Sequence, residues 1–508
     1  MGGVKTSLLD FLRHQTKSFT STMKFAAVIC EFNPFHNGHA HLLQEARKLS
    51  GCDALLCVMS GDFVQRARPA AADMRLRAHA ALLNGADAAI ELPALYATAC
   101  GEQFAAGAIN IIGSIPGVAH LCFGSESGRL KYLQKAAEIQ CKESGLFKQT
   151  LRRLLDEGRP YAAAYAQATE KELGEAAPRL PNDVLGVEYL KRLLKTGSAI
   201  QPVAIQRVGA GYRGAEHKGA YSSASALRDF FKSGDFDAAK NAMPESAYRL
   251  FQADFDKYRQ ADEYFDVLAA EALRSRDLSL CPDGGEGLEL KLKKNARKFA
   301  ALDKIVAATK SKRYTEARIR RLCLQALLGI THYPGQGAGD DETKNEKRKT
   351  KNDRLNQITN EDESCAVGRE SSPVAAAESP SLPIHYSLFT IHSPAPHSSL
   401  LTPNSPPSAI RHPPSTVFTI HSPSAAPPLP AKLLGVNAAL KNAILRVLPK
   451  NIIVRNKDFE AYVSALSPVG QEAARYIWRV NRIAAGIYPL LRARDGEFYA
   501  SEPLLVTE

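Results

Sequence analysis

The amino-acid sequence predicts an α/β protein built on a parallel sheet and followed by a mostly helical region. Over residues 24–127, short apolar runs alternate with segments whose apolar residues recur at helical spacing. That alternation indicates βαβ units and therefore a parallel sheet. Polar, glycine-containing motifs directly follow the apolar runs, and ligands of such sheets bind at the carboxyl ends of the strands.

Each element has its own local signal. Residues 25–29 form a short apolar run with β-branched residues, closed by Asn33 and Pro34, as expected of a buried strand that ends in a turn. Residues 40–49 place leucines and an alanine on one helical face. The other strand candidates are residues 54–59, 88–92 and 118–123, and the other helix candidates are residues 73–84 and 102–112.

The junction of the first strand and the first helix, residues 30–41, is the most informative segment. Backbone N–H groups and the positive end of the helix dipole meet there, which favours a bound anion. His36 and His39 add donors that can follow negative charge as it grows on a phosphate, and Gly38 lets the backbone approach it. We therefore predict nucleotide chemistry at a phosphorus centre. Two alternatives stay open: a metal ion shared by His36 and His39, or by His39 and His41, and histidines incidental to a turn.

Composition narrows the class of protein. The chain has 508 residues and a formal net charge of +12, which leaves room for two or three domains and suggests a polyanionic partner. Nine cysteines, an odd number without a C-x-x-C pair, indicate a reducing compartment, so we expect a cytoplasmic protein. No apolar run approaches the roughly 18 to 20 residues of a membrane span. The sequence does not indicate an oligomeric state.

Six motifs occur in the order of one known family. They are residues 28–41, 59–66, 85–93, 123–126, 181–186 and 207–212. The H-N-G-H after the first strand is similar to the H-x-G-H signature of the nucleotidyltransferase superfamily, whose fold is a Rossmann-like doubly wound sheet. Together the six motifs resemble the tRNA(Met) cytidine acetate ligases. The resemblance covers about residues 24–331 and resumes near residue 432.

The resemblance implies an ATP site. Asn182 offers an acceptor and two donors for an adenine edge or a ribose, although it could equally cap the helix that begins near Val184. Arg207 offers a planar fork for phosphate. The residues that match the family's ATP-binding positions are Val28, Ile29, Cys30, Glu31, Phe32, Asn33, Pro34, Phe35, His36, Asn37, Gly38, His39, Ala40, His41, Gly124, Asn182, Arg207 and Val208.

A second signature follows at residues 222–228, where a serine-rich helix start precedes an arginine. In the superfamily such a segment holds the terminal phosphates, so the resemblance implies catalytic roles for Ser225 and Arg228 beside His36 and His39. Ser223 is a further candidate in the same segment. The alternative is a plain serine N-cap.

Four positions depart from the family pattern. Ala67 and Arg68 stand where the family usually has Gly-Glu, Met74 replaces a usual Lys, and Ala226 replaces a usual Ser. These departures leave the loop conformation and the activity open.

The helical region carries a basic cluster at residues 310–321. We expect Arg313, Arg318 and Arg321 to contact tRNA phosphates, with RNA affinity that falls steeply as salt rises. A solvated helix face is the alternative.

Composition and the family resemblance together divide the chain into five parts. We expect residues 1–22 to be a disordered N-terminal extension, residues 23–232 the nucleotidyltransferase-like ATP-binding domain, and residues 233–332 the first part of a helical tRNA-binding domain. Residues 333–431 are rich in Pro, Ser and His and cannot bury enough apolar surface to offset chain entropy, so we expect a disordered insert. Residues 432–508 would complete the C-terminal domain.

The resemblance also implies a reaction. The protein would join acetate to AMP from ATP, release pyrophosphate, and pass the acetyl group to N4 of the wobble cytidine, position 34, of elongator tRNA(Met). Mg²⁺ is expected as for other ATP-using transferases, although no acidic cluster indicates a protein site for it. The alternatives are a nucleotidyltransferase that acts on a small cofactor precursor and an inactive RNA-binding relative.

Overall fold

The computed structural model describes residues 23–208, 220–334, 433–437, 463–464, 466, 468–492 and 504–506. All of them belong to one compact unit. The predicted N-terminal extension lies outside the described residues, as does the predicted insert apart from its first two residues. None of the helices in these ranges is both long and apolar enough to cross a membrane.

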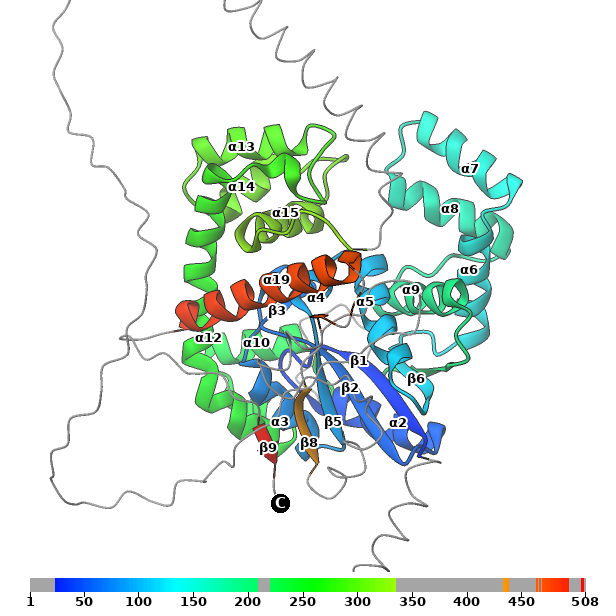
Figure 1. Cartoon of the computed structure of the whole chain (residues 1–508), viewed down its shortest axis with the longest axis vertical. Helices are drawn as coiled ribbons and strands as arrows, with labels where there is room; N and C mark the ends of the chain where they lie inside the picture. Colours follow the sequence, from blue (N-terminus) through cyan, green and yellow to red (C-terminus); the bar gives the residue numbers. More distant parts are fainter. Residues whose placement is uncertain are drawn as a thin grey trace, which may run out of the picture. The chain divides into compact units, whose positions relative to one another are not determined.

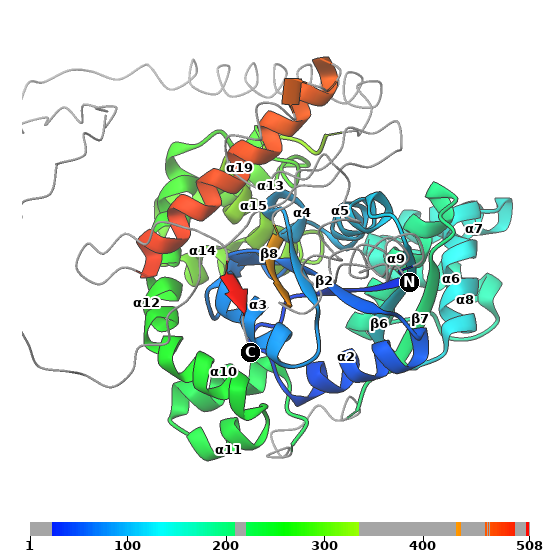
Figure 2. The same cartoon turned by 60° about the horizontal axis from the view of Figure 1, so that its bottom comes forward.

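Five neighbouring strands of the sheet run parallel to one another (Figures 1 and 2). They are β1 (Phe25–Cys30), β2 (Ala54–Ser60), β5 (Ala88–Leu92), β6 (Val118–Ser125) and β7 (Gln201–Gln206). Their order is β7-β6-β1-β2-β5, so the chain extends the sheet first on one side of β1 and then on the other. The predicted Rossmann-like, doubly wound fold is confirmed. The order reverses between β1 and β6, and ligands of such sheets bind at the carboxyl ends of the strands there.

Two apolar cores lie on the two faces of the sheet. Successive residues of β1 enter opposite cores: Ala27 and Ile29 join one, whereas Val28 and Cys30 join the other. Every residue of β1, β2 and β5 is buried. A strand buried on both faces reads as a continuous apolar run rather than an alternating one, which is why these strands could be located from the sequence.

Helices cover both cores. The first core is lined by α4 (Ala94–Ala97), α5 (Gly101–Ser114), α6 (Leu130–Lys142) and α9 (Pro181–Thr196). The second is lined by α2 (Asn37–Ser50), α3 (Met74–Leu83), α10 (Ala224–Ser233) and α11 (Phe236–Asn241). Two further helices follow: α8 (Tyr161–Leu173) packs beside α6, and α7 (Gly145–Asp156) packs against α8.

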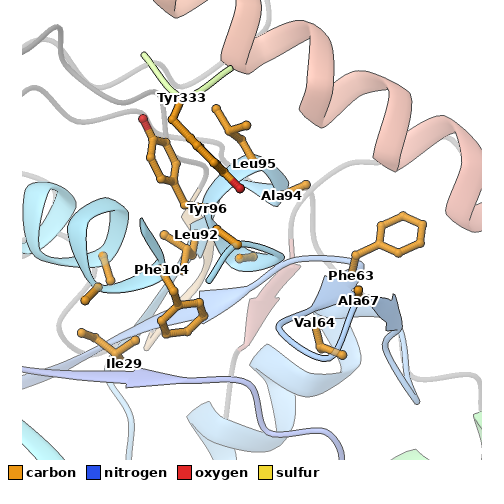
Figure 3. Close-up of a cluster of buried hydrophobic side chains, with 14 of the residues drawn as sticks. Ile29, Phe63, Val64, Ala67, Leu92, Ala94, Leu95, Tyr96, Phe104 and Tyr333 are labelled. Atoms are coloured by element: carbon orange, nitrogen blue, oxygen red, sulfur yellow. The ribbon is translucent and has the colours of Figure 1, made fainter. Parts of the chain in front are cut away.

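Figure 3 shows part of the first core, where Ile29 of β1 and Leu92 of β5 face Phe104 and Tyr96. Tyr333 packs in the same cluster and is only 8% exposed. The aromatic ring of Tyr333, which the prediction placed at the start of the insert, therefore belongs to the core.

A single long helix, α12 (Glu245–Ser275), connects the sheet to the helical region. Its first half places Phe251 and Phe255 in the second core, and its second half places Phe265 and Leu273 in the first. It is followed by the 3₁₀ helix η1 (Leu278–Leu280) and by α13 (Leu288–Lys298), α14 (Leu302–Thr309) and α15 (Glu316–Leu328). The helical region predicted for residues 233–332 thus shares its core with the sheet.

The described segments after residue 431 contain one long helix and two short strands. The helix α19 (Pro468–Arg492) lies beside α12 (Figures 1 and 2). However, β8 (Leu433–Asn437) pairs antiparallel with β5, and β9 (Leu504–Val506) pairs with β8. The sequence did not indicate these two strands, because β8 pairs with β5 more than 340 residues away and β9 pairs with β8 69 residues away, so neither pairing leaves a local pattern.

A small hairpin follows β2. Its strands are β3 (Phe63–Val64) and β4 (Arg68–Pro69). At the turn Ala67 has a φ of 56°, a left-handed conformation that glycine adopts without strain. Arg68 fixes the hairpin to α12, because its guanidinium pairs with Asp262 at 2.9 Å and with Asp266, and it lies 5.2 Å from the ring centroid of Phe265.

Replacing Ala67 with glycine should leave the free energy of unfolding within about 0.5 kcal/mol of the native value, because relief of the left-handed strain offsets the loss of one buried methyl group. Ala78→Gly is the matched control. Ala78 is equally buried but lies inside α3, so its replacement should cost about 2 kcal/mol in helix propensity and methyl burial. Urea denaturation measures both, and equal losses of stability would contradict the strained turn.

Candidate active site

The loop between β1 and α2 brings His36 and His39 together. Their rings stack with centroids 3.6 Å apart, and the backbone N–H of His36 donates to Nδ1 of His39 at 3.3 Å. A Cβ at Gly38 would lie 2.9 Å from Cε1 of His36. Glycine is therefore needed here to make room for the imidazole, a reason that adds to the predicted approach of a phosphate.

Both histidines are neutral in the free protein. Burial, and then the charge of Arg207, lowers the pKa of His36 to about 3. Burial also lowers the pKa of His39 well below the usual value, with further contributions from His36 and Arg207. Nδ1 of His36 is buried and has no hydrogen-bond partner within the described part of the chain. A ligand oxygen at this point would satisfy that nitrogen.

Arg207 follows β7 and lies against the end of β6. Its N–H donates to the carbonyl of Ser125 at 2.9 Å, and a Cβ at Gly124 would lie 3.4 Å from Cγ of Arg207. The structure thus places Gly124 and Arg207 in contact, and the charge of Arg207 reaches both histidines. The predicted residues from β1, β6 and β7 meet at the point where the strand order reverses.

Asn182 does not cap a helix, because α9 begins at Pro181 and its N-cap is Leu180. Instead its amide group donates to Oε1 of Glu126 at 2.6 Å, and the other carboxylate oxygen of Glu126 accepts from the N–H of Asp183 at 2.9 Å. A carboxylate can only accept, so the amide must turn its NH₂ toward Glu126. The Asn182 carbonyl is left to accept a donor from a ligand.

The serine-rich segment reaches the same loop. Arg228 donates from Nη1 to the carbonyl of Asn33 at 2.6 Å and from Nη2 to Oγ of Ser225 at 3.1 Å. Ser223 is the N-cap of α10 and accepts from the N–H of Ala226, so the N-cap alternative holds for Ser223. Asn37 also ties α2 to this region, because its side chain donates to the carbonyl of Ala220 at 2.8 Å.

Sequence reasoning missed the role of Arg77. Its side chain is 2% exposed and donates to the carbonyls of Glu31 at 2.7 Å and Ser60 at 3.0 Å, and also to those of Gly61 and Ala72. The guanidinium therefore fixes the loops after β1 and β2. An arginine four residues after the N-cap of a helix gives no local sign that it points into the sheet edge. Glu126 was missed as a partner of Asn182 for a similar reason.

The four departures from the family pattern are accommodated. Ala67 adopts the left-handed turn, and Arg68 pairs with the acids of α12. Met74 is buried in the second core at the start of α3. Ala226 still supplies its backbone N–H to the Ser223 cap, so what it lacks is a side-chain hydroxyl.

The three arginines predicted to contact tRNA are not equivalent. Arg321 forms two bonds with Asp283, at 3.0 and 2.8 Å, and is 17% exposed. Arg318 bonds to Glu286 at 3.0 Å and is 24% exposed. Arg313 is 64% exposed and lies 3.8 Å from Glu286. The structure therefore turns Arg321 inward and leaves Arg313 facing solvent.

The metal alternative for the histidines finds no ligand set in the described residues, where no group of three or more His, Cys, Asp or Glu side chains could hold an ion.

Neutral histidines and a helix N-terminus at the switch point of a doubly wound sheet define a nucleotidyltransferase of the H-x-G-H class. Residues 23–348 match the family model described as HIGH Nucleotidyl Transferase. The tRNA(Met) cytidine acetate ligase of Fervidobacterium nodosum is 37% identical over 314 residues, which cover 61% of this chain and 74% of the relative. That of Clostridium acetobutylicum is 35% identical over 324 residues, covering 61% and 80%. The chain belongs to the tRNA(Met) cytidine acetate ligase family.

A solved structure has the same fold. The crystal structure of Thermotoga maritima TmcAL bound with alpha-thio ATP matches with a TM-score of 0.56 at 30% sequence identity, over 61% of this chain and 76% of that one.

The low histidine pKa values predict that the free protein loses stability as pH falls. Unfolded His36 takes up a proton below about pH 6.5, whereas folded His36 stays neutral until about pH 3. Between these values the unfolded state binds more protons, so unfolding becomes easier, by about 2 kcal/mol at pH 5 for this one residue.

Urea denaturation between pH 5 and pH 8 tests this. His36→Gln should flatten the dependence of the unfolding free energy on pH. His41→Gln removes a half-exposed imidazole from the same helix and controls for the removal of a histidine as such. Equal pH slopes in the native protein and in His36→Gln would contradict the low pKa of His36 in the folded protein.

Proposed function

We propose that this protein is an ATP-dependent tRNA(Met) cytidine acetate ligase. It would activate acetate as acetyl-adenylate and transfer the acetyl group to N4 of the wobble cytidine of elongator tRNA(Met). The observation that carries the proposal is the pair of neutral, stacked histidines at the N-terminus of α2, where Nδ1 of His36 has no hydrogen-bond partner among the described residues. Family membership supports the substrates, since the relatives are named for tRNA(Met) and acetate.

In the first step an oxygen of acetate attacks the α-phosphorus of ATP, and the bond to the bridging oxygen breaks to release pyrophosphate. Negative charge grows on the α-phosphate oxygens as the new bond forms. His36 and His39 would donate hydrogen bonds to these oxygens, together with the backbone N–H groups that begin α2. Because the imidazoles start neutral, they act as donors rather than as fixed charges.

The departing phosphates need cations. Arg228 and Ser225 lie against the loop after β1 through the bond from Arg228 to Asn33, which supports the predicted role in holding the β- and γ-phosphates. Mg²⁺ would enter with the nucleotide, because it is usually held by substrate phosphates and water rather than by a protein cage. The absence of a three-ligand acidic or histidine group in the described ranges fits that mode of binding.

The adenine would lie beside α9. The orientation forced on Asn182 by Glu126 leaves a carbonyl acceptor, which suits the exocyclic amine of adenine or a ribose hydroxyl.

In the second step the N4 amine of cytidine attacks the acetyl carbon, and AMP leaves. The tRNA would approach the same edge of the sheet. The basic helical region would add affinity by binding phosphates of the tRNA backbone.

His39→Ala should reduce acetate-dependent ATP–pyrophosphate exchange by about 10²-fold or more, as for the removal of one transition-state donor. Circular dichroism and the melting temperature should stay close to those of the native protein at pH 8, which separates a chemical role from a structural one. Full exchange activity in a folded His39→Ala protein would refute the assignment.

Glu126→Gln should weaken ATP binding about tenfold, the equivalent of about 1.4 kcal/mol. The substitution removes one acceptor oxygen, so either the start of α9 or the Asn182 amide loses its partner. Because Asn182 would bind ATP and the transition state equally, KM should rise while kcat changes little. Glu138→Gln, at an exposed position on α6, is the control. A large fall in kcat with unchanged KM would contradict a positioning role.

A further inference from the structure

We infer that a row of cations on α13 is the surface that contacts the phosphates of the tRNA. The α13 row consists of Lys291, Lys294 and Lys298, and it is continued by Arg313. The inference rests on the proposed function, which supplies the tRNA, and it replaces α15 with α13 as the main contact.

Helical spacing places the three lysines together. Positions i, i+3 and i+7 lie on one face of a helix, so Lys291, Lys294 and Lys298 form a stripe along α13. Tyr314 joins this stripe to Arg313, because the Nζ of Lys291 and the guanidinium of Arg313 each lie 5.8 Å from its ring centroid. The Tyr314 hydroxyl donates to the carbonyl of Glu286 at 2.6 Å and fixes the ring.

Among the described residues, acids do not neutralise the lysines of the row, whereas Arg313 has one distant carboxylate partner. Within the described ranges none of the three lysines forms an ion pair, and Lys294 and Lys298 are exposed. Arg313 lies 3.8 Å from Glu286, a carboxylate that Arg318 approaches more closely, at 3.0 Å.

The arginines of α15 contrast with this row. Arg320 pairs with Asp303 and with Glu316, both at 3.0 Å, and Arg321 pairs with Asp283 at 2.8 Å. A phosphate would have to displace these carboxylates before it could bind. Between these two helices, the described cations that no carboxylate holds therefore lie on α13 rather than on α15.

Stabilisation of the helix dipole does not account for the row. Cations favour the last turn of a helix, which explains Lys298 but not Lys291 or Lys294. The end of α13 also has another cation, since Arg274 donates to the carbonyls of Ala296 at 2.9 Å and Phe299 at 3.2 Å.

The chemistry of the row fits a phosphate backbone. Lysine is a flexible point charge that suits phosphate without reading bases. Seven residues of α-helix span roughly 10 Å, which allows contact with more than one phosphate. In Figure 1, α14 and α15 lie between α13 and the strands. Such a contact would bind parts of the tRNA away from the modified base.

The test uses the full chain and a transcript of elongator tRNA(Met). In the variant Lys291→Gln, Lys294→Gln, Lys298→Gln, we expect the dissociation constant for tRNA to rise at least tenfold. The slope of log affinity against log salt should become shallower by about 0.7–0.9 for each phosphate that the variant no longer binds. Acetate-dependent ATP–pyrophosphate exchange, measured without tRNA, should not change.

A second triple variant, Lys148→Gln, Arg152→Gln, Lys171→Gln, removes the same charge from exposed positions on α7 and α8 and should retain native affinity and slope. Equal effects of the two triple variants would overturn the α13 row and leave only bulk charge. If the first variant melts early, Lys294→Gln, Lys298→Gln alters only exposed side chains, and unchanged tRNA binding in it would count against the row in the same way. Absence of exchange in the native protein would refute the proposed ligase while leaving the binding comparison valid.

Discussion

Four backbone carbonyl oxygens converge on the guanidinium group of Arg77. One follows β1, two lie at the end of β2, and one lies just before α3. Burial of a charged side chain is costly unless its donors are satisfied, and five N–H groups in a rigid fork suit several carbonyls at once. The loops after two neighbouring strands are thereby held at fixed positions. One of them carries His36 and His39, and the other leads into the hairpin that Arg68 anchors to α12.

The electrostatics of the site follow from that rigid frame. Burial keeps both histidines neutral, and Arg207 reinforces this. Permanent positive charge in the site comes from arginines at its margin. This arrangement suits chemistry at phosphorus, because the neutral histidines can donate to charge as it grows while the arginines hold the departing phosphates. A separate set of lysines on α13, which pair with no acid in the described part of the chain, would bind a long polyanion without altering the charge at the reacting phosphorus.

The long helix α12 makes the sheet and the helical region a single folding unit, because its two halves enter the two cores on opposite faces of the sheet. The two residues of the hairpin that depart from the family pattern, Ala67 and Arg68, fit this arrangement. Arg68 finds two carboxylates on α12, and Ala67 keeps the left-handed turn with a buried methyl group. These positions therefore give no physical reason to expect loss of the ATP site.

Sequence alone determined the parallel sheet, the strand at residues 88–92 and the histidine loop, because apolar periodicity and turn residues act between neighbours in the chain. It did not determine the partner of Asn182, which is Glu126, 56 residues away, or the pairing of Arg321 with Asp283, 38 residues away. The strands β8 and β9 were not indicated by the sequence for the same reason, since their pairing partners are fixed only when the chain folds. The neutrality of His36 likewise depends on burial, which only the tertiary structure decides, because desolvation arises from residues distant in sequence.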